Sequence, residues 1–418
     1  MIGVHFFRPT SESIYMRESY TQKNLNELQQ SPFSFSNSAP QFSGATFAEF
    51  FAGIGLMRMA LERQGWRIAY ANDIDTKKYE MYRGQFSDAD SHFKLGDIHK
   101  TRGNDIPPVT LATASFPCND LSLAGAREGL KGKQSSAFWG FVQIVEEMEG
   151  NRPPIILLEN VTGFLTSHRG LDFFEAMTAL NKLGYSVDAF VVDALLFVPQ
   201  SRQRLFVVGI RGNHSDYRHQ ARLRSVQESQ LRPKRLTEFM VAHPGIRWNI
   251  RDLPDINSNR SNIEDILEDL PEDAKEWWNT DHTDYLLNQM SIRHRQIADK
   301  MIAGKRWSYG TIFRRIRNKQ SMAELRTDGV AGCLRTPRGG SGRQILFKAG
   351  YGKYFARLLT PRECARLMGA DDFYINVPLN QALFGFGDAV CVPVVEWIAH
   401  HYLNPVVNEL RQGYSLCL

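Results

Sequence analysis

Residues 45–65 read ATFAEFFAGIGLMRMALERQG. An apolar strand pattern leads into a turn that contains Gly53 and Gly55, and apolar residues at helical spacing follow the turn. Glycines between a strand and a helix let the backbone approach a ligand closely. This stretch therefore predicts the first strand–turn–helix unit of an α/β fold, with a ligand at the turn.

The same alternation continues to about residue 211, with near-continuous apolar strands that are typical of a parallel sheet. It predicts an α/β fold with a Rossmann-like, doubly wound, mostly parallel sheet. The predicted segments after the first unit are strands RIAYANDID (67–75), HFKLGDI (92–98), VTLATASFP (109–117), PPIILLENV (153–161) and QSRQRLFVVGIR (200–211), helix SAFWGFVQIVEEME (136–149), and helix-then-strand LDFFEAMTALNKLGYSVDAFVVDA (171–194).

Length and composition set outer limits on function. The chain has 418 residues, a net charge of +5 and a pI near 8.9, so two domains are expected and a polyanionic partner is allowed. The five cysteines form no CxxC pair, which predicts free thiols, a reducing cytoplasmic setting and no metal. No apolar run reaches transmembrane length and the N-terminus is too polar for a signal peptide, so we expect no membrane association.

Composition changes suggest the domain boundaries. Residues 1–44 are rich in Ser, Gln and Asn and are expected to form a loose extension. After residue 211 the chain turns polar and basic, then acidic, and residues 293–319 are basic with helical character. We expect a catalytic and cofactor-binding domain over 45–211 plus 385–418, and a smaller, irregular target-recognition domain over 212–384.

Polar residues at predicted strand ends indicate a cofactor site. Gly53, Gly55, Asp73 and Asp97 each follow a strand, and such ends line the ligand crevice of an open α/β sheet. Asp73 is positioned to hold ribose hydroxyls. The set predicts a nucleoside-containing cofactor, and a purely structural tight turn is the alternative.

A second group of strand-end residues suggests chemistry. Cys118 follows a strand and a proline, which suits a nucleophile whose pKa is lowered. Glu159 ends a buried strand, where a carboxylate suggests a general acid or a substrate hydrogen bond. Arg202 and Arg204 share one strand face and suit a phosphate or a ring carbonyl. A structural ion pair between Glu159 and Arg204 is the alternative, and it is compatible with the functional interpretation.

Taken together, these motifs resemble the cytosine-5 DNA methyltransferases of bacterial or phage type, over roughly residues 45–211 and 355–400. The motifs FAEFFAGIG, NDID, GDI, SFPCNDLS, ENV, PQSRQR, RLLTPRECARLMG and FGFGDAVCVPV occur in that family's order. The resemblance implies an S-adenosylmethionine-dependent enzyme that flips a cytosine out of double-stranded DNA. It also implies a final helix from the carboxyl end that packs on the large domain.

The resemblance assigns a role to individual residues. It implies that Cys118 is the nucleophile on a loop shaped by Pro117, and that Glu159 contacts the cytosine with Asn160 bracing the site. It implies that one of Arg202 and Arg204 reaches the base carbonyl. The cofactor residues that it implies are Phe51, Ala52, Gly53, Ile54, Gly55, Asp73, Ile74, Asp97, Ile98, Pro117, Asp388, Ala389 and Val390. The chain departs from the family at Leu56, where a glycine is usual, at residues 119–121, and at Asp388, where asparagine is usual.

DNA contacts are expected from basic residues of the second domain. Arg314, Arg315 and Arg317 suit phosphates, and Arg335, Arg338 and Arg343 suit base edges in a groove. We expect a monomer, located in the cytoplasm at the nucleoid of a prokaryotic cell. It would act either in a restriction–modification system, with a cognate restriction endonuclease as a partner, or in a solitary DNA-modification system. The alternatives are a transfer-RNA cytosine methyltransferase of the same fold, a small-molecule Rossmann enzyme, and a non-catalytic DNA-binding protein.

Overall fold

The computed structural model describes residues 44–117, 136–212, 222–258, 261–317, 320–336 and 343–415. Cys118 and nearly all of the predicted N-terminal extension lie outside the described residues. The described residues belong to one compact unit that begins at Gln41.

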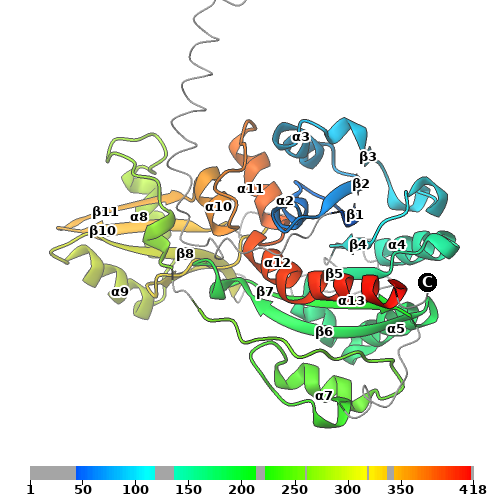
Figure 1. Cartoon of the computed structure of the whole chain (residues 1–418). Coiled ribbons are helices and arrows are strands. Elements are labelled where there is room, and N and C mark those ends of the chain that lie inside the picture. The colour runs from blue at the N-terminus through cyan, green and yellow to red at the C-terminus, as the bar shows by residue number, and fades with distance from the viewer. Residues whose placement is uncertain are drawn as a thin grey trace, which may run out of the picture. The chain divides into compact units, whose positions relative to one another are not determined.

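The larger sheet has seven strands in the order β3-β2-β1-β4-β5-β7-β6 (Figure 1). Its neighbouring strands pair in parallel except β7, which is antiparallel to both β5 and β6. This arrangement confirms the predicted mostly parallel α/β fold. The strands are β1 (Thr46–Phe50), β2 (Arg67–Asp73), β3 (Phe93–Leu95), β4 (Leu111–Ala114), β5 (Ile155–Val161), β6 (Tyr185–Asp193) and β7 (Gln203–Arg211).

The order of the strands creates a switch point between β1 and β4. The chain moves outward from β1 through β2 to β3, and then returns to β4 on the other side of β1. Connections on the two sides of such a point diverge, which opens a crevice at the carboxyl ends of the strands. The fold therefore predicts a ligand site at the ends of β1, β2, β4 and β5.

Alternating side chains of the strands support helices on both faces of the sheet. In β1, Phe47 belongs to one buried cluster, whereas Ala48 and Phe50 belong to the other. Helices α2, α3 and α12 contribute to the first cluster, and α4, α5 and α7 to the second. Their bounds are α2 (Leu56–Arg63), α3 (Thr76–Gln85), α4 (Ser136–Glu147), α5 (Leu171–Lys182), α7 (Lys234–Ala242) and α12 (Val392–Ile398).

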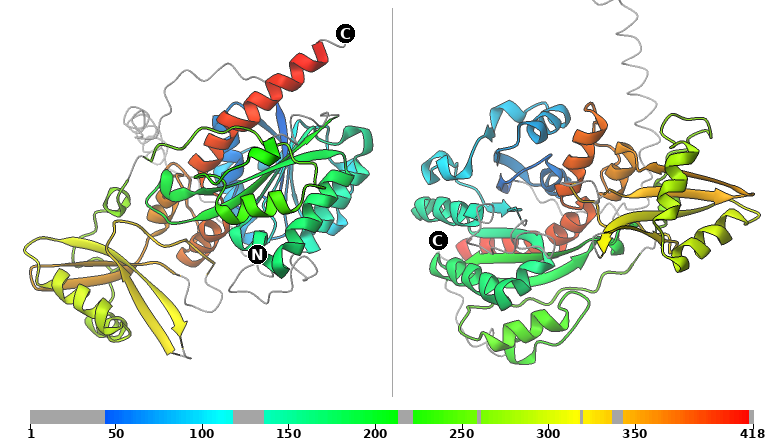
Figure 2. Two further views of the ribbon diagram at one scale, coloured as in Figure 1. Left: turned by 90° about the horizontal axis from the view of Figure 1, so that it is seen from below. Right: turned by 180° about the vertical axis from the view of Figure 1, so that it is seen from behind.

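The smaller sheet has four antiparallel strands in the order β11-β10-β8-β9, with α9 packed on it (Figure 2). Its elements are α8 (Thr280–Asn288), α9 (Ile292–Ile302), β8 (Ser308–Arg317), β9 (Gln320–Arg326), β10 (Ile345–Gly350) and β11 (Lys353–Leu358). The expected helical character of residues 293–319 is correct only for α9. Arg314, Arg315 and Arg317 lie in a strand, because aromatic and β-branched residues favour a pleated sheet there.

The segment between the two sheets contacts the larger one. Arg232 lies 2.9 Å from Asp188 of β6 in a buried ion pair, and Trp248 forms a β-bridge to Val187. Helix α7 also packs against this side of the larger sheet. The domain boundaries suggested by composition stay a prediction.

The C-terminal helices return to the larger sheet, where α12 lies beside α2 (Figure 1). Arg63 of α2 pairs with Glu396 at 3.0 Å. Among the described residues, the helical run Leu379–Gln412 is apolar and long enough to cross a membrane, but 83% of its apolar window is buried inside the protein. Core packing explains its composition. The helices are α10 (Pro361–Leu367), α11 (Leu379–Asp388), α12, the π-helical segment η9 (Ala399–Leu403) and α13 (Asn404–Ser415).

Candidate active site

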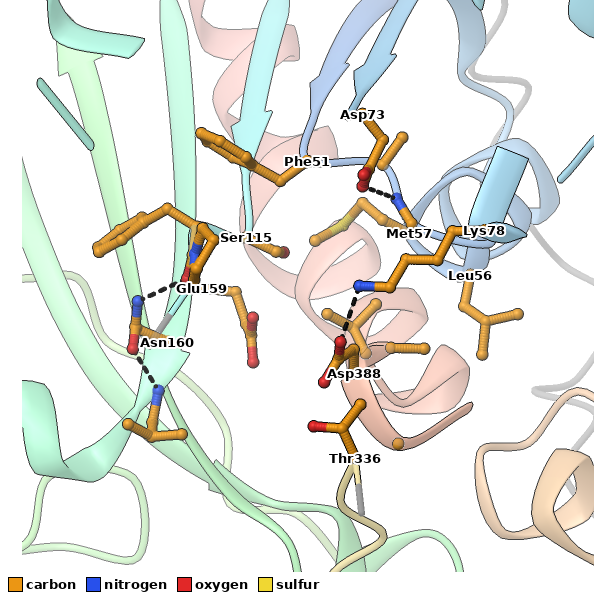
Figure 3. Close-up of a pocket in the computed structure, with 18 of the residues that line it drawn as sticks. Phe51, Leu56, Met57, Asp73, Lys78, Ser115, Glu159, Asn160, Thr336 and Asp388 are labelled. Atoms are coloured by element: carbon orange, nitrogen blue, oxygen red, sulfur yellow. Dashed lines mark hydrogen bonds and ion pairs between the residues drawn. The ribbon is translucent and has the colours of Figure 1, made fainter. Parts of the chain in front are cut away.

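A cavity of about 920 Å³ opens at the carboxyl ends of β1, β2, β4 and β5, at the switch point of the sheet (Figure 3). Most of the predicted cofactor residues line it. They are Phe51, Ala52, Gly53, Asp73, Ile74, Asp97, Ile98, Pro117, Asp388, Ala389 and Val390. The predicted catalytic residues Glu159, Asn160, Arg202 and Arg204 line the same cavity.

The glycine turn holds the carboxylate of Asp73 in a fixed position. The backbone N–H of Gly53 donates to Asp73 Oδ2 at 2.8 Å, and the N–H of Asp75 donates to Oδ1 at 2.9 Å. Gly53 has a φ of 57°, which favours glycine. The carboxylate thus faces the cavity with each oxygen already bonded once, and further acceptor capacity remains.

Ile54 and Gly55, which the resemblance also assigns to the cofactor, do not line the cavity. Ile54 is buried in the core. Gly55 caps α2 with a φ of 84°, and a Cβ at this position would lie 2.5 Å from Phe86. Both residues therefore support the turn from the side that faces the core.

Glu159 and Arg204 form an ion pair in the cavity wall, with Arg204 Nε 3.0 Å from Glu159 Oε1. Because β7 runs antiparallel to β5, Arg204 lies opposite Val161, and Glu159 is its diagonal neighbour on the same face. The expected structural ion pair is therefore present. Both groups also line the cavity, so both can contact a ligand that binds there.

Arg202 has different surroundings from Arg204. Arg202 precedes β7 and is only 3% exposed. Its guanidinium donates to the carbonyl oxygens of Leu334, Gly387 and Ala389. These carbonyls belong to two segments, 331–336 and 387–390, that converge at the cavity. Arg202 thus joins the two segments.

Asn160 connects the ends of β4 and β5. Its Nδ2 donates to the carbonyl oxygen of Phe116 at 3.1 Å, and its Oδ1 accepts from the N–H of Val161 at 2.9 Å (Figure 3). Phe116 and Pro117 lead directly to Cys118, which lies outside the described residues. Asn160 therefore orients the backbone from which the predicted nucleophile emerges.

Cys333 is a cavity residue that the sequence did not single out. Its Sγ lies 3.3 Å from Arg202 Nη1 and 3.8 Å from Arg204 Nη2. Burial alone would raise the pKa of this thiol, but Arg202, Arg204 and Arg335 outweigh burial and lower it to about 7. Its neighbours in sequence, AGCLRT, carry no recognisable signal for this position.

Glu49 and Lys78 are two further charged residues of the cavity wall that the sequence did not single out. Glu49 is buried on β1, and burial raises its pKa well above the ordinary value. Its Oε2 atom has no hydrogen-bond partner among the described residues. Lys78 of α3 pairs with Asp388 at 2.7 Å. No cluster of three His, Cys, Asp or Glu side chains that could hold a metal occurs in the described part of the chain.

The predicted DNA-contacting arginines that the structure describes lie in two regions of the protein, strand β8 and the segments at and near the cavity. Arg315 and Arg317 lie 3.8 and 2.9 Å from Glu324 of the neighbouring strand β9, and Arg314 precedes them on β8. Arg335 lines the cavity, and Arg343 donates to Asn380 at 2.7 Å. Arg338 lies outside the described residues.

Comparison with known proteins decides the family. The family described as C-5 cytosine-specific DNA methylase matches residues 45–404. The type II methyltransferase M.HaeII of Haemophilus aegyptius is 33% identical over 379 residues, which are 88% of this chain and 95% of the relative. The chain belongs to this family. The methylase is also similar to the type II methyltransferase M.HhaI of Haemophilus parahaemolyticus, at 28% identity over 86% of this chain and 95% of the relative.

Solved structures agree on the fold of this methylase. The Dnmt2 methyltransferase of S. pombe matches 87% of this chain and 99% of its own, with a TM-score of 0.58 and 19% identity. A putative DNA modification methyltransferase from an E. coli prophage matches 88% and 100%, with a TM-score of 0.51 and 17% identity. The family makes the protein a DNA (cytosine-5) methyltransferase.

Proposed function

We propose that this methylase uses S-adenosylmethionine to methylate a cytosine flipped out of double-stranded DNA, with Cys118 as its nucleophile. The observation that carries the proposal is that the predicted cofactor residues and the Glu159–Arg204 pair line one and the same cavity. A base inside a stacked duplex could not reach this cavity, so the target base must leave the helix.

The described residues fit the cofactor. Asp73 retains acceptor capacity for ribose hydroxyls, and Phe51 offers an aromatic ring. Glu49 Oε2, which has no hydrogen-bond partner in the described part of the chain, is available to a polar group of the ligand. Asp97 lies further along the same wall. When bound, S-adenosylmethionine supplies an electrophilic methyl group on a sulfonium centre.

The protein residues activate the cytosine ring, which is by itself a poor carbon nucleophile. The Cys118 thiolate forms a bond to carbon 6, which breaks the aromaticity and gives carbon 5 enamine character. Glu159 hydrogen-bonds to ring nitrogen 3 and stabilises this adduct. After methylation a base or water removes the carbon 5 proton, and the thiol leaves carbon 6.

Arg204 is the better candidate for the base carbonyl. Both arginines line the cavity. The guanidinium of Arg202 is buried and donates to three backbone carbonyls, whereas that of Arg204 donates to the carbonyl of Gln203 and pairs with Glu159. A second role for Arg204 is to keep the Glu159 carboxyl oriented. We therefore assign substrate contact to Arg204 and positioning to Arg202.

The wider setting is proposed from the relatives. Type II methyltransferases among them favour a modification system, with a restriction endonuclease as the partner. We propose a monomer that acts in the cytoplasm, contacts phosphates through Arg314, Arg315 and Arg317, and reads bases through Arg335, Arg338 and Arg343.

A 5-fluorocytosine duplex tests the nucleophile. Fluorine cannot leave as a cation, so the adduct should persist on a denaturing gel when S-adenosylmethionine is present. Peptide mapping by mass spectrometry should find the base on Cys118. Cys118→Ala should form no adduct, whereas Cys333→Ser, which removes a thiol of the described cavity wall, should still form it.

An adduct on Cys333 would overturn the assignment of the nucleophile. Methyl incorporation from labelled S-adenosylmethionine should occur on duplex DNA and stay at background on transfer RNA. The opposite preference would support the transfer-RNA alternative.

A further inference from the structure

One side chain connects helix α3 with the turn at residues 387–390. Lys78 extends from α3 into the cavity, and its Nζ lies 2.7 Å from Asp388 Oδ2 (Figure 3). A Cβ placed on Gly53 would lie 4.0 Å from Lys78 Cδ. The aliphatic part of the lysine therefore passes over the glycine turn before its ammonium reaches Asp388.

This pair differs from an ordinary surface ion pair. The Lys78 side chain is 20% exposed and that of Asp388 is 42% exposed, and both members of the pair line the cavity. Burial would lower the pKa of Lys78, but the carboxylates of Asp388, Asp73 and Asp75 outweigh it and raise the pKa. The ammonium is thus firmly charged at the cavity wall. Lys77, one residue earlier on α3, has an exposed side chain.

The two charges match those of a zwitterion in sign. An α-amino acid carries an ammonium and a carboxylate on one carbon, and hydrogen bonds to such charged groups are the stronger ones. Lys78 and Asp388 are 310 residues apart in the sequence and meet at the cavity wall, so the fold brings two opposite charges together at this point.

We propose that Lys78 binds the carboxylate, and Asp388 the ammonium group, of the amino-acid end of the methyl donor. When the donor binds, the ion pair between Lys78 and Asp388 is replaced by two ion pairs, one from each residue to the ligand. This assignment rests on the proposed use of S-adenosylmethionine. It adds Lys78 to the cofactor-binding residues.

Two probes that share one nucleoside test the assignment. S-Adenosylhomocysteine carries the amino-acid end, and 5′-methylthioadenosine lacks it. Isothermal titration calorimetry on the full-length protein should show that Lys78→Met weakens S-adenosylhomocysteine binding by about tenfold or more, because one charge-assisted hydrogen bond is removed. Binding of 5′-methylthioadenosine should stay within about twofold. Lys78→Arg should retain most of the affinity, and Lys77→Met, the matched control, should retain all of it.

The outcomes separate this inference from the proposed function. Equal losses for both probes, or no loss for either, would overturn the role of Lys78 in binding the carboxylate. If the unmodified protein bound neither probe, the proposed cofactor itself would be wrong. A selective decrease in S-adenosylhomocysteine affinity supports both.

Discussion

Arg204 Nε lies 3.0 Å from Glu159 Oε1, across two strands that run in opposite directions. In a sheet that is otherwise parallel, the reversed strand β7 begins at the end where β5 finishes. That reversal places the arginine beside the glutamate at the carboxyl end of β5. A parallel β7 would have placed Arg204 at the opposite edge of the sheet.

Replacing the carboxyl group tests its part in the reaction. We expect Glu159→Gln to slow single-turnover methylation by about a hundredfold or more, because it weakens stabilisation of the ring adduct. Affinity for S-adenosylhomocysteine should stay within about twofold. Glu175→Gln, on the exposed side of α5, is the control. A rate within about fivefold of the unmodified protein would remove Glu159 from the chemistry.

Arg202 should matter for stability. Arg202→Met leaves two buried carbonyl groups and one half-buried carbonyl group without this donor, so the free energy of unfolding should fall by about 2–4 kcal/mol. Urea denaturation measures it. Arg335→Met, an exposed change in the adjoining segment, should alter it by less than about 0.5 kcal/mol. If Arg202→Met lowered the free energy of unfolding no more than Arg335→Met, contacts other than those of Arg202 would hold segments 331–336 and 387–390 together.

The Cys333 thiol should react at neutral pH. Since its pKa is about 7, the thiolate fraction and the iodoacetamide alkylation rate should rise on the order of tenfold from about pH 6 to about pH 8. Cys391 serves as the reference, because burial raises the pKa of its thiol to about 12. Mass spectrometry of the peptides distinguishes the sites.

Removing a nearby charge tests the cause of that pKa. Arg204→Met deletes a guanidinium 3.8 Å from the sulfur, so the alkylation profile of Cys333 should move to higher pH. An unchanged profile would show that Arg204 does not set the pKa.

The arginines of β8 should contribute to DNA affinity on every sequence. Neutralising Arg314, Arg315 and Arg317 together should make the slope of log K against log salt shallower by about 0.9 for each phosphate that is no longer neutralised. Binding isotherms at several salt concentrations, on target and scrambled duplexes, measure it. The control triple Lys182, Lys234 and Arg235 removes the same charge from exposed positions of α5 and α7. Equal slopes for the two triples would argue against a phosphate role.

The sequence predicted the elements of the cavity better than their pairings. Strand ends and glycines are local signals, so Asp73 and Glu159 could be placed at one edge of the sheet from the sequence alone. The direction of β7 depends on its hairpin with β6, so the contact between Glu159 and Arg204 could be named only as an alternative.

Residues brought together from distant segments escaped prediction. Arg202 is buried because segments 331–336 and 387–390 close over it, and neither segment is near it in sequence. Cys333 reaches the cavity by the same convergence. The strand of Arg314 is a different case: the residues TIFRRIR did carry a β signal, but their charge favoured a helix interpretation.

The packing of α12 on α2 affects how the chain folds during synthesis. Arg63 of α2 donates to Glu396 of α12 at 3.0 Å, so the first helix of the larger sheet finds this packing partner 333 residues further along the chain. While the ribosome is still adding the intervening residues, the apolar face of α2 that packs against α12 stays exposed to solvent. Contacts of such long sequence separation slow folding. Nascent chains that stop before α12 should therefore depend on chaperones and be cleaved readily by proteases.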